Sequence, residues 1–310
     1  MKRIVFVYEY LSLGGVETIL ATRMKHLKRM GHTVRAMFLQ NKGGRSLFSD
    51  MQEDEIFIPI TPLEKSDFLT NFKPDLIVSI DTPSIIEIAH ATNPSIPILY
   101  EVHTTYEREL RFLKSQKFLQ QLSMIVVPSA TQEAFIKKIL RSPQSIRIVP
   151  NALDERFLTP LEETPSSENP IVTWVGRLDE VKNWRAYLEI AGRVARQHPG
   201  ASFRLIGGLY SPMDKQDTLW MLIQKFNLES RFHWYPAITP DQMPAMLDQT
   251  RCSGGCVIST SRTESFGMSI LEAMSRACAV VVPEGGALAE LAPHQERGLN
   301  YKPKDRKSVV

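Results

Sequence analysis

The sequence predicts an α/β protein made of two doubly wound domains with parallel sheets. Short apolar runs alternate with helix-length segments, the pattern breaks once near residues 155–168, and it then starts again. Strands separated by helices pair in parallel, because the crossover returns the chain to the same end of the sheet. A chain of 310 residues is also long enough to bury two cores.

The first half begins with a βαβ unit. We expect a strand over residues 4–8, a helix over 16–30 that stops at Gly31, and a second strand over 33–39. Five further strands are expected before the break, at residues 55–60, 75–80, 96–102, 124–127 and 146–150.

A stretch rich in Pro, Ser and Glu, ERFLTPLEETPSSENP, indicates an interdomain linker. We therefore place the domains at residues 1–160 and 161–310. In the second domain, helices are expected over 183–197 and 215–226 and from Met268, with strands at residues 171–175, 202–206, 232–235, 256–259 and 279–282. Open α/β sheets bind ligands outside the carboxyl ends of their strands, so we expect an active site between the domains.

Composition is that of a soluble globular protein, with 43% hydrophobic and 23% charged residues. No apolar run approaches the roughly 20 residues that span a bilayer, and Glu9 interrupts the segment where a signal peptide would be apolar. We expect a cytoplasmic protein. Its three cysteines include no Cys-x-x-Cys pair, which favours thiols over disulfides or a zinc site.

Net charge is +3, too small to indicate a nucleic-acid partner. The first 150 residues are the more basic part, with 19 Lys and Arg against 15 Asp and Glu. Residues 106–121 are expected to form a basic amphipathic helix, which either packs on the sheet with a charged outer face or meets an anionic membrane. Its basic residues are Arg108, Arg111, Lys114 and Lys117, and its apolar residues are Leu110, Phe112, Leu113 and Phe118.

Three motifs follow expected strands. LSLGGVET contains Gly14 and Gly15, which form either a tight turn or a bare backbone that approaches an anionic group at a helix start. The motif lacks the Gly-x-Gly-x-x-Gly spacing, which disfavours a dehydrogenase. VGRLDEVKNW places Arg177 and Lys182 at the carboxyl end of a strand, either as solvated cations or as ligands of a diphosphate.

The third motif, STSRTESFGMSILEAM, has the strongest signal for a binding site. Glu264 is expected in a loop, and Glu272 about one turn inside the helix that begins near Met268. Free amides at that helix start suit phosphate oxygens, and carboxylates accept hydrogen bonds from sugar hydroxyls. The alternative is an amphipathic helix with unrelated acids.

These motifs, together with YEVH at residues 100–103 and VPNALD at 149–154, give the sequence a family resemblance. The chain resembles the retaining GT-B glycosyltransferases of family 4, also described as glycosyl transferases group 1. The resemblance implies two Rossmann-like domains facing a cleft, the first binding a saccharide or lipid-linked acceptor and the second a nucleotide sugar. UDP is the commonest nucleotide in the family, and envelope glycan synthesis is the expected setting.

The resemblance also implies residue roles. Arg177 and Lys182 would hold the donor diphosphate, Glu264 the transferred sugar and Glu272 the ribose. The remaining implied positions are Phe266, Gly267, Met268 and Ser269, which act through their backbone, Gly15, which closes on the diphosphate, and His103, which lies by the sugar or is a structural histidine. No cofactor and no metal is expected, since cations replace the metal and no Asp-x-Asp arrangement suits one.

The chain departs from the family pattern at three places. Asn183 and the run Ala277-Cys278-Ala279 stand where the family usually has Gly and Gly-x-Pro. The sequence ends at YKPKDRKSVV, where further strands and helices usually follow. Two alternatives stay open: a catalytically inactive GT-B subunit that binds a partner or glycan, and a sugar-nucleotide epimerase with the same two-domain fold.

Overall fold

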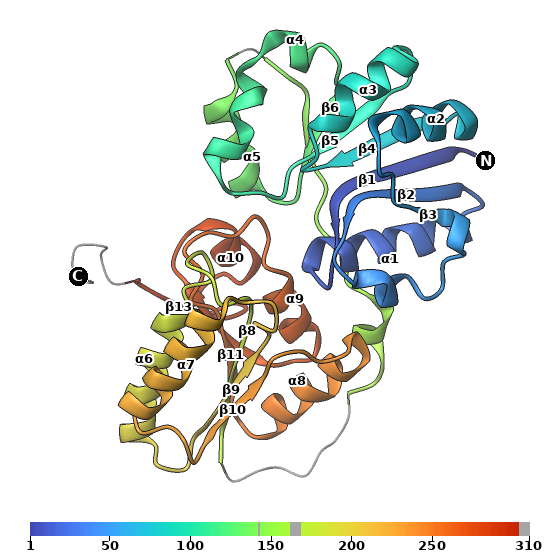
Figure 1. Ribbon diagram of the computed structural model, residues 1–310. Helices are drawn as coiled ribbons and strands as arrows, with labels where there is room; N and C mark the ends of the chain where they lie inside the picture. The colour runs from blue at the N-terminus through green and yellow to red at the C-terminus, as the bar shows by residue number, and fades with distance from the viewer. Residues whose placement is uncertain (142, 162–168, 304–310) are drawn as a thin grey trace. The chain divides into compact units, whose positions relative to one another are not determined.

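The computed structural model describes residues 1–141, 143–161 and 169–303. The chain divides into two compact units, Met1–Asp154 and Glu155–Val310, so the division falls slightly before the expected residue 160. Each unit is a parallel sheet flanked by helices (Figure 1). Residues 162–168 of the expected linker and residues 304–310 lie outside the described residues.

Unit 1 has a seven-stranded sheet in the order β3-β2-β1-β4-β5-β6-β7. Its strands are β1 (Arg3–Leu11), β2 (Thr33–Asn41), β3 (Ile56–Phe57), β4 (Leu76–Ile80), β5 (Ile98–Glu101), β6 (Met124–Val127) and β7 (Ile146–Ile148). Its helices are α1 (Gly15–Arg29), α2 (Pro62–Phe72), α3 (Ser84–Thr92), α4 (Gln116–Leu119) and α5 (Ala130–Ile139), with 3₁₀ segments η1 (Gly44–Phe48), η2 (Glu53–Glu55) and η3 (Glu107–Lys114).

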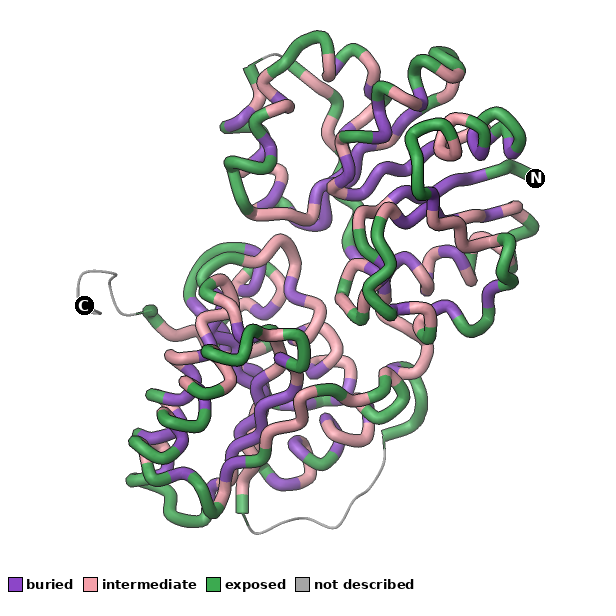
Figure 2. The backbone as a smooth tube through the Cα atoms, in the orientation of Figure 1, coloured by how far each residue is buried: buried purple, intermediate pink, exposed green. Residues whose placement is uncertain are grey.

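The helices cover both faces of this sheet, because alternate strand residues point to opposite sides. On β1, Val5 and Val7 lie in the core shared with α2, α3 and α5, whereas Ile4 and Phe6 lie in the core shared with α1. Figure 2 shows the result as buried strands beneath helices whose outer sides are exposed. The sheet therefore exposes polar groups mainly at the ends of its strands.

The expected helix over residues 106–121 is not continuous. The structure has the 3₁₀ segment η3, an extended Ser115, and then the single turn α4. Leu110 and Leu113 are fully buried, and Phe112 and Phe118 stack edge to face in the same core. The apolar side of this segment is thus committed to the unit 1 core, which corrects the idea that it is available for a membrane.

Unit 2 has a six-stranded parallel sheet in the order β10-β9-β8-β11-β12-β13. Its strands are β8 (Ile171–Val175), β9 (Ser202–Ile206), β10 (Phe232–Tyr235), β11 (Cys256–Ile258), β12 (Ala279–Pro283) and β13 (Leu299–Tyr301). Its helices are α6 (Trp184–Gln197), α7 (Met213–Lys225), α8 (Met243–Cys252), α9 (Met268–Ser275) and α10 (Gly286–Leu291), with 3₁₀ segments η4 (Glu155–Leu158) and η5 (Pro240–Gln242).

A buried ion pair fixes the start of unit 2 to its helices. The guanidinium of Arg276, which caps α9, binds the carboxylate of Asp248 on α8, and both side chains are almost fully buried. Arg276 also donates to the carbonyls of Thr159 and Pro160, at 2.7 and 3.1 Å. The segment after η4 is therefore held against α8 and α9 by one arginine.

Candidate active site

The carboxyl end of β8 presents Arg177 on an open turn. The side chain of Arg177 is 76% exposed, and its Nη2 lies 3.0 Å from Oδ2 of Asp179. Gly207, at the end of the neighbouring β9, has φ +111°, and an added Cβ would lie 2.3 Å from the carbonyl oxygen of Gly176. The two strand ends approach closely because glycine is present there. The guanidinium of Arg177 is therefore accessible just after the end of β8, where the sequence predicted it.

Lys182 is positioned by the turn that leads into α6. The hydroxyl of Thr260 lies 3.0 Å from the carbonyl oxygens of Lys182 and Asn183, and it accepts a bond from Nε1 of the buried Trp174. Asn183 itself has φ 52°, a left-handed conformation that glycine and asparagine adopt most readily. The departure from the family's glycine at this position is therefore sterically suited to the turn.

The structure brings Lys182 and Glu264 into direct contact. Nζ of Lys182 forms a salt bridge with Oε1 of Glu264, although the residues lie 82 positions apart in the sequence. The hydroxyl of Ser261 also donates to that oxygen, at 2.8 Å. Two of the residues selected from separate motifs thus form one polar cluster, with both side chains partly exposed.

Glu264 precedes the start of α9, where the resemblance placed the phosphates. Gly267 is the N-cap of α9 with φ +105°, and an added Cβ would lie 2.4 Å from Leu288. Gly267 has no side chain to cap the first amides of α9, and the first amides of a helix have no partner in the preceding turn. Phe266, Met268 and Ser269 flank the N-cap and Glu272 lies within α9, so these expected donor-binding residues share one loop and helix, whereas Arg177 and Lys182 lie between β8 and α6.

In unit 1, the Gly14-Gly15 turn is already lined by a carboxylate. Glu17, in the first turn of α1, is buried and accepts a 3.0 Å bond from the amide of Ser12. A Cβ on Gly14 would lie 2.5 Å from Oε2 of Glu17. Neither glycine has a positive φ, so the turn does not need glycine for its backbone conformation. Glycine is instead needed at position 14 because a side chain there would collide with Glu17. An anion approaching Gly15 would meet the charge of Glu17.

His103 follows β5 and belongs to a charged network at the carboxyl edge of the unit 1 sheet. Its Nε2 lies 2.7 Å from Oε1 of Glu101, which also binds Nη1 of Arg23 on α1 at 2.7 Å. The amide of His103 donates to Oδ1 of Asp81, at 3.0 Å. The motif YEVH indicated His103 but not these three partners. Only the acid at the end of the apolar strand, in YEVH, carried a sequence signal.

The two carboxylates of this network have opposite pKa shifts. Burial would raise the pKa of Glu101, but hydrogen bonds and positive charge from His103 and Arg23 hold it at about 2. Burial raises the pKa of Asp81 to about 6, against the opposing effects of His103. Asp81 also has φ 44° and is partly buried. A strained backbone and a displaced pKa at a strand end are typical of functional sites.

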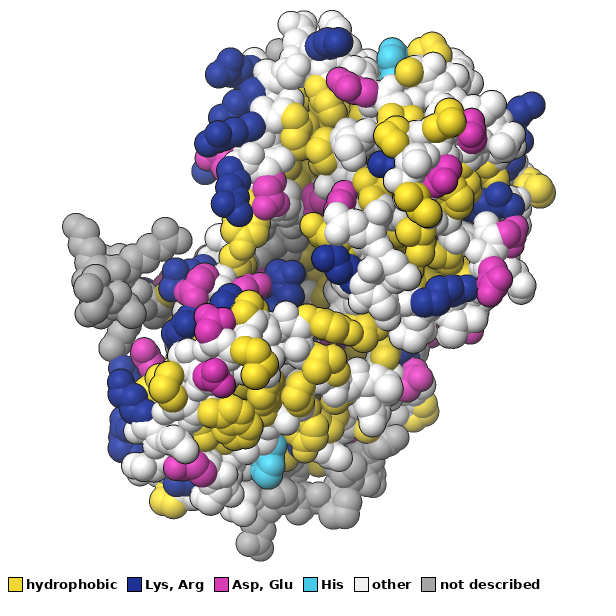
Figure 3. Space-filling view, viewed as in Figure 1, with side chains coloured by type: hydrophobic (Ala, Val, Ile, Leu, Met, Phe, Trp, Pro, Cys, Tyr) yellow, Lys and Arg dark blue, Asp and Glu magenta, His cyan; other side chains and the backbone are white. Residues whose placement is uncertain are grey.

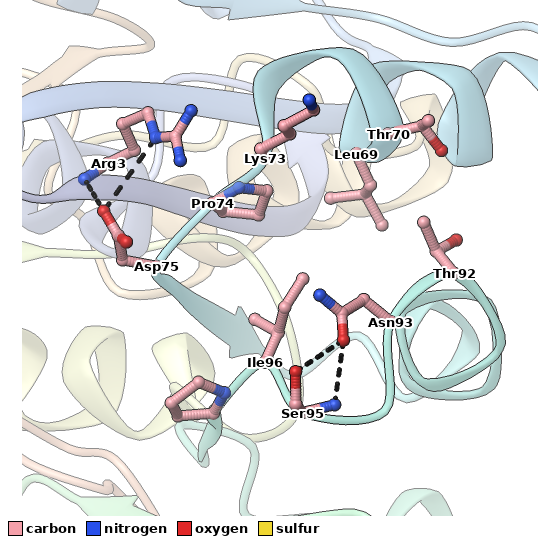
Figure 4. A pocket seen from close by; sticks show the side chains of 11 residues that line it. Arg3, Leu69, Thr70, Lys73, Pro74, Asp75, Thr92, Asn93, Ser95 and Ile96 are labelled. Atoms are coloured by element: carbon pink, nitrogen blue, oxygen red, sulfur yellow. Dashed lines mark hydrogen bonds and ion pairs between the residues drawn. The ribbon is translucent and has the colours of Figure 1, made fainter.

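A cavity on unit 1 lies at the opposite edge of its sheet and contains no predicted site residue. It is lined by the starts of β1, β4 and β5, where Asp75 binds Arg3 and the hydroxyl of Ser95 donates to Asn93 (Figure 4). Among residues 1–141, 143–161 and 169–303, no three His, Cys, Asp or Glu side chains are grouped to hold a metal. The three cysteines are free thiols, as expected.

Two family models match the chain in succession. Glycosyltransferase Family 4 matches residues 13–157, and Glycosyl transferases group 1 matches residues 160–310. Together they account for nearly all of the sequence. The chain belongs to the family 4 glycosyltransferases. Its motifs are thus placed in the two halves that the family resemblance predicted.

Solved structures confirm the GT-B fold of this family 4 chain. HepE from Anabaena, in complex with UDP and glucose, has a TM-score of 0.79 at 20% identity and aligns over 98% of this chain and 87% of its own. Sucrose-phosphate synthase from Thermosynechococcus elongatus has a TM-score of 0.79 at 16% identity over 98% and 87%. At these identities the likeness establishes the fold.

Curated relatives are more distant. The GPI3 subunit of phosphatidylinositol N-acetylglucosaminyltransferase from Saccharomyces cerevisiae is 24% identical over 178 residues, which cover 56% of this family 4 chain and 38% of the relative. A sucrose synthase of Acidithiobacillus caldus is 22% identical over 152 residues, covering 46% and 19%. The chain spans less than half the length of the curated relatives it matches first.

Proposed function

We propose that the chain is a retaining, metal-independent glycosyltransferase that moves a hexose-type sugar from a UDP-linked donor to a saccharide or lipid-linked acceptor. The salt bridge of Lys182 with Glu264, in the loop before the uncapped start of α9, carries the proposal. A cation for phosphate and an acceptor for sugar hydroxyls lie side by side there. UDP is chosen because HepE was solved with UDP and with UDP-glucose.

The chemistry follows from the charges. Breaking the bond between the anomeric carbon and phosphate leaves negative charge on the nucleoside diphosphate, which Arg177, Lys182 and the first amides of α9 would stabilise. These cations would serve in place of a metal. For retention, the acceptor oxygen bonds to the anomeric carbon on the face that the phosphate leaves, and the acceptor proton passes to a phosphate oxygen. No enzymic nucleophile and no cofactor is needed.

The acceptor side of the proposal concerns unit 1. Lys and Arg side chains gather along one side of unit 1 (Figure 3), and the exposed ones on η3, α4 and α5 include Arg108, Arg111, Lys117, Lys137 and Lys138. This surface could make a peripheral, purely electrostatic contact with the cytoplasmic face of a membrane, as suits an envelope glycan or lipid-linked acceptor. Within the described residues, no helix is both long and apolar enough to cross a bilayer.

Vesicle sedimentation tests the membrane contact. At low salt, the protein is expected to co-sediment with vesicles that contain an anionic phospholipid and to release them at high salt. Failure to bind the anionic vesicles at low salt would remove membrane contact from the proposal, without touching the donor site in unit 2.

Calorimetric titration tests the donor site. UDP, GDP, ADP and NAD are titrated in EDTA into the wild type, Arg177→Ala and Glu272→Ala. We expect one nucleoside diphosphate to bind with micromolar affinity and both variants to weaken it. If a folded chain binds none of them, the donor site of this chain does not function, as the inactive-subunit alternative predicts. Turnover of the sugar nucleotide without any acceptor would instead identify an epimerase.

A further inference from the structure

β10 is an open edge of the unit 2 sheet. It is the last strand in the sheet order and pairs only with β9, so its outer side carries backbone groups that no described strand satisfies. Alternate residues of a strand turn their amide and carbonyl to opposite sides. The carbonyl of Tyr235 accepts from the amide of Gly207, at 2.9 Å, so Tyr235 turns toward β9. The amide and carbonyl of its neighbour Trp234 therefore point outward.

This edge has few of the features that usually protect a sheet edge. Proteins shield such edges with very short strands, charged side chains or proline. The other three edge strands of the two described sheets, β3, β7 and β13, have two, three and three residues, whereas β10 has four. The sequence of β10 is Phe-His-Trp-Tyr, with no Lys, Glu or Pro within it. The edge is therefore suited to pairing with another strand.

The flank of α7 beside this edge is apolar and exposed. Trp220 is 50% exposed and Met213 is 70% exposed. The ring of Trp220 packs edge to face on the ring of Trp234, with the centroids 5.9 Å apart, so this flank faces the rim of β10. Figure 3 shows hydrophobic side chains gathered on unit 2 where α7 lies beside β10. Exposed aromatic surface of this kind is typical of a contact with another molecule.

Residues on this flank have the spacing of a helix-pairing seam. At successive intervals of four, three and four positions, one side of α7 carries Met213, Asp217, Trp220 and Gln224. These intervals are symmetric about their centre, so an antiparallel copy of α7 places Asp217 opposite Trp220 twice. The indole nitrogen of Trp220 is a donor and the exposed carboxylate of Asp217 is an acceptor, and among the described residues neither has a hydrogen-bond partner. A second copy supplies both.

We propose that the chain forms a two-fold symmetric homodimer through β10 and this flank of α7. A two-fold axis beside Trp234 pairs the two β10 strands antiparallel, and the Trp234 residues of the two copies exchange both backbone hydrogen bonds. The two six-stranded sheets then form one continuous sheet, with the two α7 helices packed antiparallel on one face. The indole rings of Trp220 and Trp234 from both copies are buried around the axis. The interface contains none of the residues proposed to bind the donor.

Sedimentation equilibrium of the full chain tests the dimer without any nucleotide. We expect twice the monomer mass, with a dissociation constant of about 10 μM or lower. Trp220→Glu should weaken the dimer by about tenfold or more, because it removes the indole ring and faces Asp217 of the second copy with a like charge. Met221→Glu is the matched control. Met221 is 61% exposed but lies outside the seam, so its variant should stay within about twofold of wild type.

The mass measurements also contain the results that would overturn the dimer. A wild type that stays monomeric at about 100 μM would do so. Trp220→Glu dimerising as tightly as wild type would do so as well, because the contact would then lie elsewhere. Equal weakening by Met221→Glu and Trp220→Glu would show that the seam is not the contact. Circular dichroism confirms that both variants are folded.

Hydrogen exchange tests the pairing of β10 in the wild type. On dilution below the dissociation constant, the amide of Trp234 should exchange faster, because it points away from β9 and loses its bond to the second copy. The amide of Tyr235 is the internal control, since it points toward β9 and stays bonded within its own sheet. Exchange of Trp234 that is the same in dimer and monomer would overturn the strand pairing and with it the proposed interface.

Discussion

Nζ of Lys182 forms a salt bridge with Oε1 of Glu264, and the two side chains are 23% and 15% exposed. The cation proposed to hold the diphosphate is therefore engaged by the carboxylate proposed to hold the sugar. Phosphate binding must compete with this contact or rearrange it. Because the pair is partly exposed, the competition is worth on the order of 1 kcal/mol or less.

Glu264→Gln is therefore expected to increase UDP affinity by roughly two- to fivefold, since it frees Lys182 from a charged partner. Lys182→Ala should weaken UDP binding by about tenfold or more, because a charge-assisted bond to phosphate is lost. Calorimetry with UDP measures both. Glu180→Gln, which removes an exposed carboxylate paired with Arg185 and Arg262, is the matched control. Weaker UDP binding by Glu264→Gln would contradict the competition.

Ala277→Gly should stabilise unit 2 by about 0.5–1 kcal/mol. Ala277 has φ 55°, in the left-handed region, where a Cβ is strained and glycine is not. The family's usual glycine at this position has the same physical reason. Urea unfolding followed by tryptophan fluorescence reports on unit 2, because Trp174, Trp184, Trp220 and Trp234 all lie there. Lower stability of Ala277→Gly would show that the turn gains nothing from glycine.

Periodicity predicted the sheets well and the connections less well. The bounds of β6, β8, β9 and β10 are those expected, because short apolar runs bounded by polar residues have one favourable placement in a buried parallel sheet. Residues 106–121 have helical periodicity, but Ser115 is extended and the segment packs as two short pieces under the demand of the core. The periodicity of the sequence does not reveal how this segment must pack on the rest of the unit 1 core.

The same distinction applies to the site. Motifs selected Lys182, Glu264 and His103, because those residue types follow strands and begin helices. The contact between Lys182 and Glu264 depends on Thr260 holding a turn 77 residues away, and Arg23 reaches Glu101 only through the packing of α1 on the sheet. Both contacts join residues that are far apart in the sequence, so no local motif could have predicted either of them.

Arg276→Leu should destabilise unit 2 by about 3–5 kcal/mol, because it removes the closer of the two arginines beside the buried carboxylate of Asp248 and leaves Arg251 at 4.0 Å. The same fluorescence-monitored unfolding measures the loss. Adding Asp248→Leu to Arg276→Leu should recover part of it, since a buried charge that has lost its closest partner is then removed. Arg185→Ala, which breaks an exposed pair with Glu180 and a contact with the ring of Trp184, is expected to cost at most about 2 kcal/mol. A similarly small loss of stability in Arg276→Leu would show that the buried pair of Arg276 and Asp248 does not stabilise unit 2.

Asp81→Asn should change the pH dependence of stability. Burial raises the pKa of Asp81 from 3.8 to about 6, so its protonated form favours the folded state and this contribution is lost as pH rises from about 4 through about 6. Asparagine keeps an acceptor for the amide of His103, tolerates φ 44° and never ionises. Relative to wild type, Asp81→Asn should therefore become more stable with rising pH, by at most about 3 kcal/mol.

Urea unfolding followed by circular dichroism, at about pH 4.5 and about pH 7.5, measures this difference. Comparing the variant with wild type at each pH cancels the titration of the groups that they share and that lie far from Asp81. Asp67→Asn, on the exposed side of α2, should show no such trend. If the stability difference between Asp81→Asn and wild type is the same at both pH values, Asp81 ionises freely in the folded protein. The left-handed backbone of Asp81, with φ 44°, would then be unrelated to its ionisation.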